Sequence, residues 1–176
     1  MKERMIRKAL PEEFQEVRLF YHAVIDGLEG REHHPKWQKD VYPSPEDLMT
    51  EIEEGNLYLY LCDGQIAGSM VLNKKHSREY DDVSWPEKLQ SGEFFVIHML
   101  GIRSDFEGRG LAREMVRFAI HLAKESGLKA VRLDVIEGNL PAERLYESMG
   151  FKHIDAISIF YEVVGSMNFS IYEYRL

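Results

Sequence analysis

The sequence predicts an α+β fold in which about four helices flank a mixed sheet of about seven strands. Segments with a helical spacing of apolar residues and capping signals alternate with short apolar runs that are typical of strands. No internal repeat or low-complexity segment interrupts this order. A length of 176 residues, 44% of them hydrophobic, is enough for a single core. We therefore expect one domain over residues 1–176.

The N-terminal part is expected to contain a strand followed by two helices. Residues 5–8 form the short strand, and residues 11–28 carry apolar side chains along one helical face. The second helix begins at Ser44, which is followed by a proline and two acidic residues, as is typical of a helix N-terminus. This helix is predicted to run to about Glu54 and to stop at Gly55.

A hairpin and an alternation of strands and helices are expected to follow. The turn Asp63-Gly64 lies between two apolar runs, which indicates a hairpin of residues 56–62 and 65–73. The remaining predicted elements are a strand over 93–102, a helix from Gly108 or Arg109 to Ser126 that ends at Gly127, a strand over 129–136, a helix over 140–149, and two strand-like pieces within 151–176 around Val164, Gly165 and Ser166.

A candidate anion site lies where the strand ending at residue 102 leads into the next helix. A short polar loop is followed by Gly-Arg-Gly-Leu-Ala, residues 108–112, at the start of an amphipathic helix. Small residues there let a ligand approach the backbone, and the unpaired N–H groups and the helix dipole favour an anion. The sequence therefore predicts a phosphate-bearing ligand. Arg103, Arg109 and Arg113 surround the loop, and we expect one or two of them to help hold phosphate.

Two common phosphate-binding loops match this stretch poorly. The Walker loop is absent, since no Gly-Lys-Ser or Gly-Lys-Thr occurs. A dinucleotide fingerprint fails at its third glycine, which is Arg113, although Asp134 stands where a ribose-binding acid would. A nucleotide-dependent oxidoreductase is therefore a distant alternative.

A second motif, GNLPAERLYESMGF, spans residues 138–151. Asn139 is a good N-cap, and Pro141 suits the first helical turn. Gly150 is expected to end this helix as a left-handed cap. The apolar face at i, i+3, i+4 and i+7 spacing comprises Ala142, Leu145, Tyr146 and Met149.

Together the two motifs resemble the GNAT superfamily of acyl-CoA-dependent N-acyltransferases. That family carries a strand with an L-x-V-like end, then R/Q-x-x-G-x-G/A, and further on N-x-x-A-x-x-L-Y-E-x-x-G-F. Here the strand end reads Leu-Gly-Ile at residues 100–102, and residues 139–151 match the second motif throughout. The first motif departs at Glu107, where the family has arginine or glutamine. The resemblance covers residues 93–151 and implies a mostly antiparallel sheet.

The resemblance implies that the cofactor is acetyl-CoA. Its pyrophosphate would lie on the backbone of residues 108–112, and its pantetheine arm would pair with residues 100–102 in the manner of a missing strand. A glycine in that strand fits a close approach to the backbone. The residues implied to contact the cofactor are Leu100, Gly101, Ile102, Glu107, Gly108, Arg109, Gly110, Leu111, Ala112, Arg113, Asn139, Ala142 and Tyr146.

Tyr146 is the predicted general acid. In the resembling family this tyrosine donates a proton to the coenzyme sulfur, and a phenol is protonated at pH 7. For the base, some relatives carry a glutamate on the fourth strand, near Val96 here. His98 shares that strand face and has a suitable pKa range, although a lone histidine in an apolar strand is more often a core residue. Asp134 and Glu93 are lesser candidates for the base.

Composition and charge limit the classes of molecule that the protein is expected to bind. A net charge of −8 argues against general nucleic-acid binding and favours a cationic acceptor. No apolar run is long enough to span a membrane and the N-terminus is too charged for a signal peptide, so we expect a cytoplasmic protein. Cys62 is expected to be a strand residue, and no metal site is expected from His33 and His34, which have no partners at ligand spacing.

We therefore expect an N-acetyltransferase that acts on a small-molecule or peptide amine. Residues 29–43 and 74–92 form two loops with aromatics and acids, which either shape the site of a cationic acceptor or are ordinary surface structure. The alternative on the same fold is a non-catalytic acyl-CoA-binding module. The strand-like tail, residues 168–176, could also pair with a second copy in a homodimer.

Overall fold

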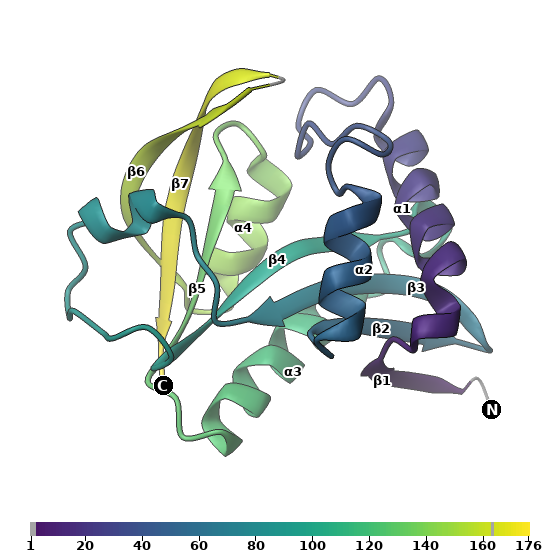
Figure 1. Cartoon of the computed structure of the whole chain (residues 1–176), viewed down its shortest axis with the longest axis horizontal. Coiled ribbons are helices and arrows are strands. Elements are labelled where there is room, and N and C mark those ends of the chain that lie inside the picture. Colours follow the sequence, from purple (N-terminus) through teal and green to yellow (C-terminus); the bar gives the residue numbers. More distant parts are fainter. Residues whose placement is uncertain (1–2, 163) are drawn as a thin grey trace. The chain divides into compact units, whose positions relative to one another are not determined.

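The computed structural model describes residues 3–162 and 164–176 (Figure 1). Its helices and strands lie within about two residues of the expected bounds, except that the first helix begins at Phe14, three residues after its expected start at residue 11. The strands are β1 (Arg4–Lys8), β2 (Leu57–Cys62), β3 (Gln65–Asn73), β4 (Phe94–Ile102), β5 (Ala130–Ile136), β6 (Lys152–Tyr161) and β7 (Gly165–Arg175). The helices are α1 (Phe14–Leu28), α2 (Pro45–Glu53), α3 (Leu111–Glu125) and α4 (Leu140–Ser148), with short 3-10 turns η1 (Pro11–Glu13), η2 (Arg78–Asp82) and η3 (Ser104–Phe106).

The seven strands follow the order β1-β2-β3-β4-β5-β7-β6 in one sheet. Antiparallel pairing joins β1 to β2, β2 to β3, β5 to β7 and β7 to β6, whereas β4 and β5 run parallel. The predicted α+β class and the mixed, mostly antiparallel sheet are therefore confirmed. The three 3-10 turns were not predicted as separate elements.

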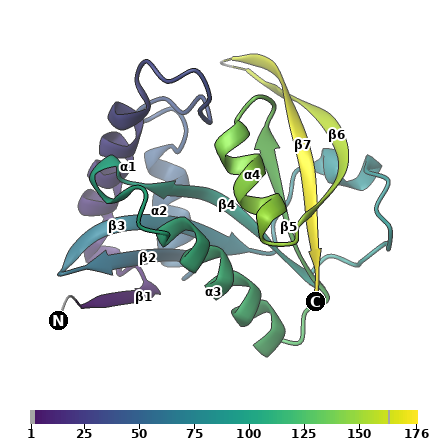
Figure 2. The same cartoon turned by 180° about the vertical axis from the view of Figure 1, so that it is seen from behind.

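One compact unit comprises the described residues 3–31, 37–72 and 98–118. In this unit α1 and α2 lie on one face of β2 and β3 (Figure 1), and the first part of α3 lies on the other face (Figure 2). Ser44 caps α2 by accepting a hydrogen bond from the Asp47 N–H (3.1 Å), as the sequence predicts. The ring of Tyr58 in β2 contacts Phe118 of α3, with 5.2 Å between centroids.

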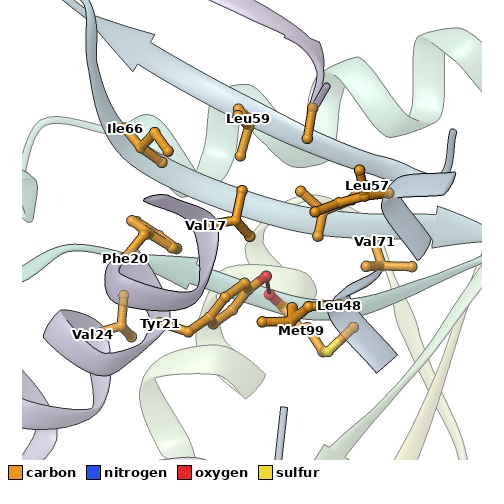
Figure 3. Packing of buried hydrophobic residues seen from close by; sticks show 12 residues of the cluster. Val17, Phe20, Tyr21, Val24, Leu48, Leu57, Leu59, Ile66, Val71 and Met99 are labelled. Atoms are coloured by element: carbon orange, nitrogen blue, oxygen red, sulfur yellow. Dashed lines mark hydrogen bonds between the residues drawn. The ribbon is translucent and has the colours of Figure 1, made fainter. Parts of the chain in front are cut away.

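The core of this unit contains a buried tyrosine that fixes an irregular point of β4 (Figure 3). The Tyr21 hydroxyl donates to the backbone carbonyl of Met99 (2.8 Å) and lies 3.0 Å from the Ser69 hydroxyl. Because a phenol has one proton, Ser69 is the donor in the second bond. Met99 has a φ of 52°, which is uncommon for a residue other than glycine. The Tyr21 bond therefore helps to hold an unusual backbone conformation in this strand.

The second compact unit comprises the described residues 32–36, 73–97, 119–162 and 164–176. Here α4 lies on one face of the β5–β7 ribbon in both views (Figures 1 and 2). The segment around η2 contributes Tyr80 and Val83 to a second buried cluster, whose other members are Phe94, Val96, Ala130 and Ile171.

Candidate functional site

Gly108 and Gly110 shape the loop between β4 and α3. Their φ angles are 72° and 78°, in the left-handed region that glycine adopts without a steric penalty. At each residue, no atom lies within 4 Å of the position that a Cβ would occupy. The backbone of this loop is therefore open to a ligand at both glycines.

Helix α3 begins directly after this loop. Its first turn closes with a hydrogen bond from the Glu114 N–H to the Gly110 carbonyl (3.1 Å). The N–H groups before Glu114 have no carbonyl of their own helix to bind, and together with the helix dipole they favour an anion. The loop thus fits the phosphate-bearing cofactor that the resemblance implies. In this first turn Leu111 is buried, whereas Ala112 and Arg113 are half-buried.

Arg103 and Arg109 contact residues of the loop and its surroundings. Arg103 binds the Asp105 carboxylate through Nε and Nη2 (2.7 and 2.8 Å) and also donates to Gln65 (2.9 Å). This pairing lowers the pKa of Asp105. Arg109 donates to the Asp105 backbone carbonyl (2.8 Å), and both guanidinium groups lie about 5 Å from the Phe106 ring, at 4.8 and 5.0 Å. Arg103 is therefore neutralised by a carboxylate, whereas the contacts of Arg109 with Asp105 and Phe106 leave its charge in place.

Glu107, which departs from the family pattern, is paired with a cation. Its Oε1 lies 3.0 Å from Nη1 of Arg31, a residue just beyond α1. The pair offsets the negative charge of Glu107. It also places the guanidinium group of Arg31 beside the loop. Both side chains are exposed, so the pair contributes little to stability. No signal in the sequence links Arg31 to this loop.

The end of β4 contains the three residues implied to pair with the pantetheine arm. Leu100 and Ile102 are half-buried. A Cβ at Gly101 would lie 3.2 Å from Cζ3 of Trp37 and 3.4 Å from Cγ1 of Val24. The protein's own side chains therefore explain why a glycine is needed there, and its contact with a cofactor stays a prediction.

The candidates for the base have different surroundings. His98 is half-buried on β4, so it is not a fully buried core residue, and its catalytic role stays a prediction. Glu93 forms an ion pair with Lys129 (2.6 Å), and this hydrogen bond lowers the pKa of Glu93. A carboxylate that is stabilised in its charged form is a weaker base, which makes Glu93 the poorer candidate.

The helix with the second motif begins and ends as expected, except for its cap. Asn139 occupies the N-cap position, but its side chain makes no capping hydrogen bond, so that part of the prediction is wrong. Instead its backbone carbonyl accepts bonds from the N–H groups of Ala142 (3.1 Å) and Glu143 (3.2 Å). Its ψ of 67° departs from the extended conformation usual at this position. Gly150 ends the helix with a φ of 96°, as predicted.

Tyr146 is buried with its ring against Phe151, at 5.5 Å between centroids. Within the described residues its hydroxyl has no hydrogen-bond partner. Burial, followed by the negative charge of Asp134, raises the pKa of Tyr146. The phenol therefore stays protonated at neutral pH, as a proton donor must be.

Asp134 on β5 accepts a hydrogen bond from the Tyr80 hydroxyl, 2.6 Å from its Oδ2. Tyr80 belongs to the loop of residues 74–92. The sequence marks it only as one aromatic residue of that loop, and no pattern connects it to a strand 54 residues further on.

The part of the chain that the structure describes holds neither a metal-binding cluster nor a membrane-spanning helix. It contains no group of three or more histidine, cysteine or acidic side chains placed to hold a metal ion. None of its helices combines the length and the apolar character needed to cross a bilayer.

Comparison with known proteins agrees with this geometry. The sequence model of the acetyltransferase (GNAT) family matches residues 22–151. A mycothiol acetyltransferase from Thermobifida fusca is 30% identical over 128 residues, which cover 73% of this chain and 33% of that protein. The chain thus spans about a third of the length of this curated relative.

Solved structures share the fold across nearly the whole chain. A GNAT-family acetyltransferase from Streptococcus agalactiae has a TM-score of 0.79 at 20% identity, with 98% of this chain and 95% of that chain covered. A putative acetyltransferase from Salmonella typhimurium, solved with its cofactor acetyl-CoA, has a TM-score of 0.70 at 16% identity, covering 98% and 94%. At these identities the likeness establishes the fold alone.

Proposed function

The chain belongs to the GNAT acetyltransferase family, and from this premise we propose that it transfers an acetyl group from acetyl-CoA to a primary amine of a small molecule or peptide. The observation that carries the proposal is the open, glycine-shaped loop at the N-terminus of α3. The name of the curated relative makes small molecules the first class of acceptor to test.

The proposed mechanism assigns a role to each part of the site. When bound, acetyl-CoA supplies a thioester for direct attack by the amine and a thiolate as the leaving group. The backbone N–H groups of residues 108–112 bind the pyrophosphate. The backbone of residues 100–102 aligns the pantetheine arm and stabilises the negative charge that develops on the carbonyl oxygen. His98, the candidate base, accepts the proton that the attacking amine loses, and Tyr146 donates its proton to the leaving sulfur.

The direct test is a thermal-shift titration with acetyl-CoA, longer acyl-CoAs, free CoA and NAD(P), followed by thiol-release assays over a panel of amines. We expect stabilisation by acetyl-CoA and thiol release with at least one amine. Stabilisation without turnover on any amine would favour the non-catalytic acyl-CoA-binding module. Stabilisation by NAD(P) but not by CoA would overturn both interpretations.

A substitution of Gly110 by aspartate tests the phosphate loop. We expect Gly110→Asp to weaken acetyl-CoA binding by about tenfold or more, because it places a carboxylate among the N–H groups that face the phosphates. Gly110→Asn is the matched control, since asparagine has a similar size and a similar tolerance for a positive φ without the charge. Calorimetry on both folded variants measures the difference. Equal affinities for the two variants would show that no phosphate lies at Gly110.

A further inference from the structure

Asp134 is a half-buried carboxylate that has no cationic partner within the described residues. Its one hydrogen bond is the short one from Tyr80 to Oδ2, which leaves Oδ1 without a partner in that part of the chain. Arg132, two positions back on the same strand, is already bound to Glu173 (2.8 Å). Because a half-buried charge is unfavourable without a partner, Asp134 is suited to bind a cation from outside the protein.

The partner of Asp134 is held rigidly. Tyr80 is 2% exposed, and the Trp85 indole N–H donates to its backbone carbonyl (2.8 Å). The His76 ring stacks on the phenol at 5.5 Å between centroids. Burial and the neighbouring carboxylate raise the pKa of Tyr80 well above its usual value, so its hydroxyl remains a donor. The carboxylate of Asp134 is therefore fixed in position before any ligand arrives, which favours selective binding.

The charge of Asp134 also affects the pKa values of two further tyrosines. After burial, that charge is the next cause of the raised pKa of both Tyr146 and Tyr161. The carboxylate is thus within electrostatic reach of the hydroxyl proposed as the acid. A half-buried carboxylate held by a phenol hydroxyl suits an organic ammonium group, which can donate a charge-assisted hydrogen bond to it.

We propose that Asp134, positioned by Tyr80, binds an ammonium group of the acceptor through Oδ1, and that this group is a second cation rather than the nitrogen that is acetylated. The reacting nitrogen must be deprotonated before it can attack the thioester. A carboxylate instead binds most strongly to a nitrogen that stays protonated and charged. The acceptor class is therefore a diamine or a similar dication. This assignment rests on the proposed acetyl transfer.

The test compares straight-chain diamines of three to five carbons with the amino alcohols of the same lengths. Binding to the full chain is measured by calorimetry in the presence of free CoA, so that no reaction occurs. We expect Asp134→Asn to weaken diamine binding by about tenfold or more and to leave amino-alcohol binding little changed. Asparagine still accepts a bond from Tyr80, so the change removes chiefly the charge. Tyr80→Phe should weaken diamine binding to a smaller extent.

The matched control is Asp81→Asn, which removes an exposed carboxylate from the same loop as Tyr80. It should leave diamine affinity unchanged. The proposal is overturned if Asp134→Asn affects diamines and amino alcohols equally, if it affects neither, or if the wild type binds no diamine. A wild type that acetylates amino alcohols but does not prefer diamines would refute this assignment alone. A wild type that releases no thiol with any amine would instead refute the proposed function.

Discussion

Replacing Tyr146 by phenylalanine is expected to lower kcat by about 100-fold or more, with little change in the affinity for acetyl-CoA. The substitution removes only the hydroxyl, while the ring that packs against Phe151 remains. Since that hydroxyl has no partner within the described residues, its loss breaks no hydrogen bond of the folded chain. The expected effect therefore falls on the proton transfer to the leaving sulfur.

Steady-state kinetics and calorimetry with CoA separate the two contributions. Tyr174→Phe is the matched control, because Tyr174 also packs its ring against Phe151, at 5.4 Å between centroids. This control should keep full activity. If Tyr146→Phe lowers binding and turnover by the same factor, Tyr146 has a structural role. An unchanged kcat would show that another group protonates the thiolate.

Local signals in the sequence predicted most of the fold. Ser44 caps α2 with its side chain, and Gly150 takes the left-handed conformation that ends α4. In both places the residue type and its nearest neighbours along the chain decide the conformation. Gly108 and Gly110 were found for the same reason, since their positive φ angles belong to the loop itself.

The missed features all depend on the tertiary structure. Arg31 and Glu107 are 76 residues apart, and Tyr80 and Asp134 are 54 apart, so no local pattern pairs them. Asn139 has a suitable side chain for a cap, yet its backbone conformation leaves the cap unmade. Residue type and spacing can therefore propose a site, but they do not identify which distant charges complete it.

The largest expected loss of stability comes from separating the buried ion pair of Arg132 and Glu173. These residues are directly opposite each other on β5 and β7, and each is 2% exposed. The Arg132 guanidinium lies 3.5 Å from the Trp85 ring centroid and 4.2 Å from that of Phe94. Glu173→Gln should lower the free energy of unfolding by about 3–5 kcal/mol, because a buried cation loses its counter-charge. Urea denaturation measures this loss.

The double variant Arg132→Met, Glu173→Leu distinguishes the loss of a partner from the loss of the pair itself. Within the described residues, Oε1 of Glu173 is buried without a hydrogen-bond partner, so the native pair is incompletely satisfied. Two apolar side chains of similar volume remove both charges and should restore most of the stability lost in Glu173→Gln. Asp40→Asn, which breaks an exposed pair with Arg18 (2.7 Å), should change stability far less. If the double variant is no more stable than Glu173→Gln, the pair itself stabilises the fold, and our explanation by an isolated buried charge is wrong.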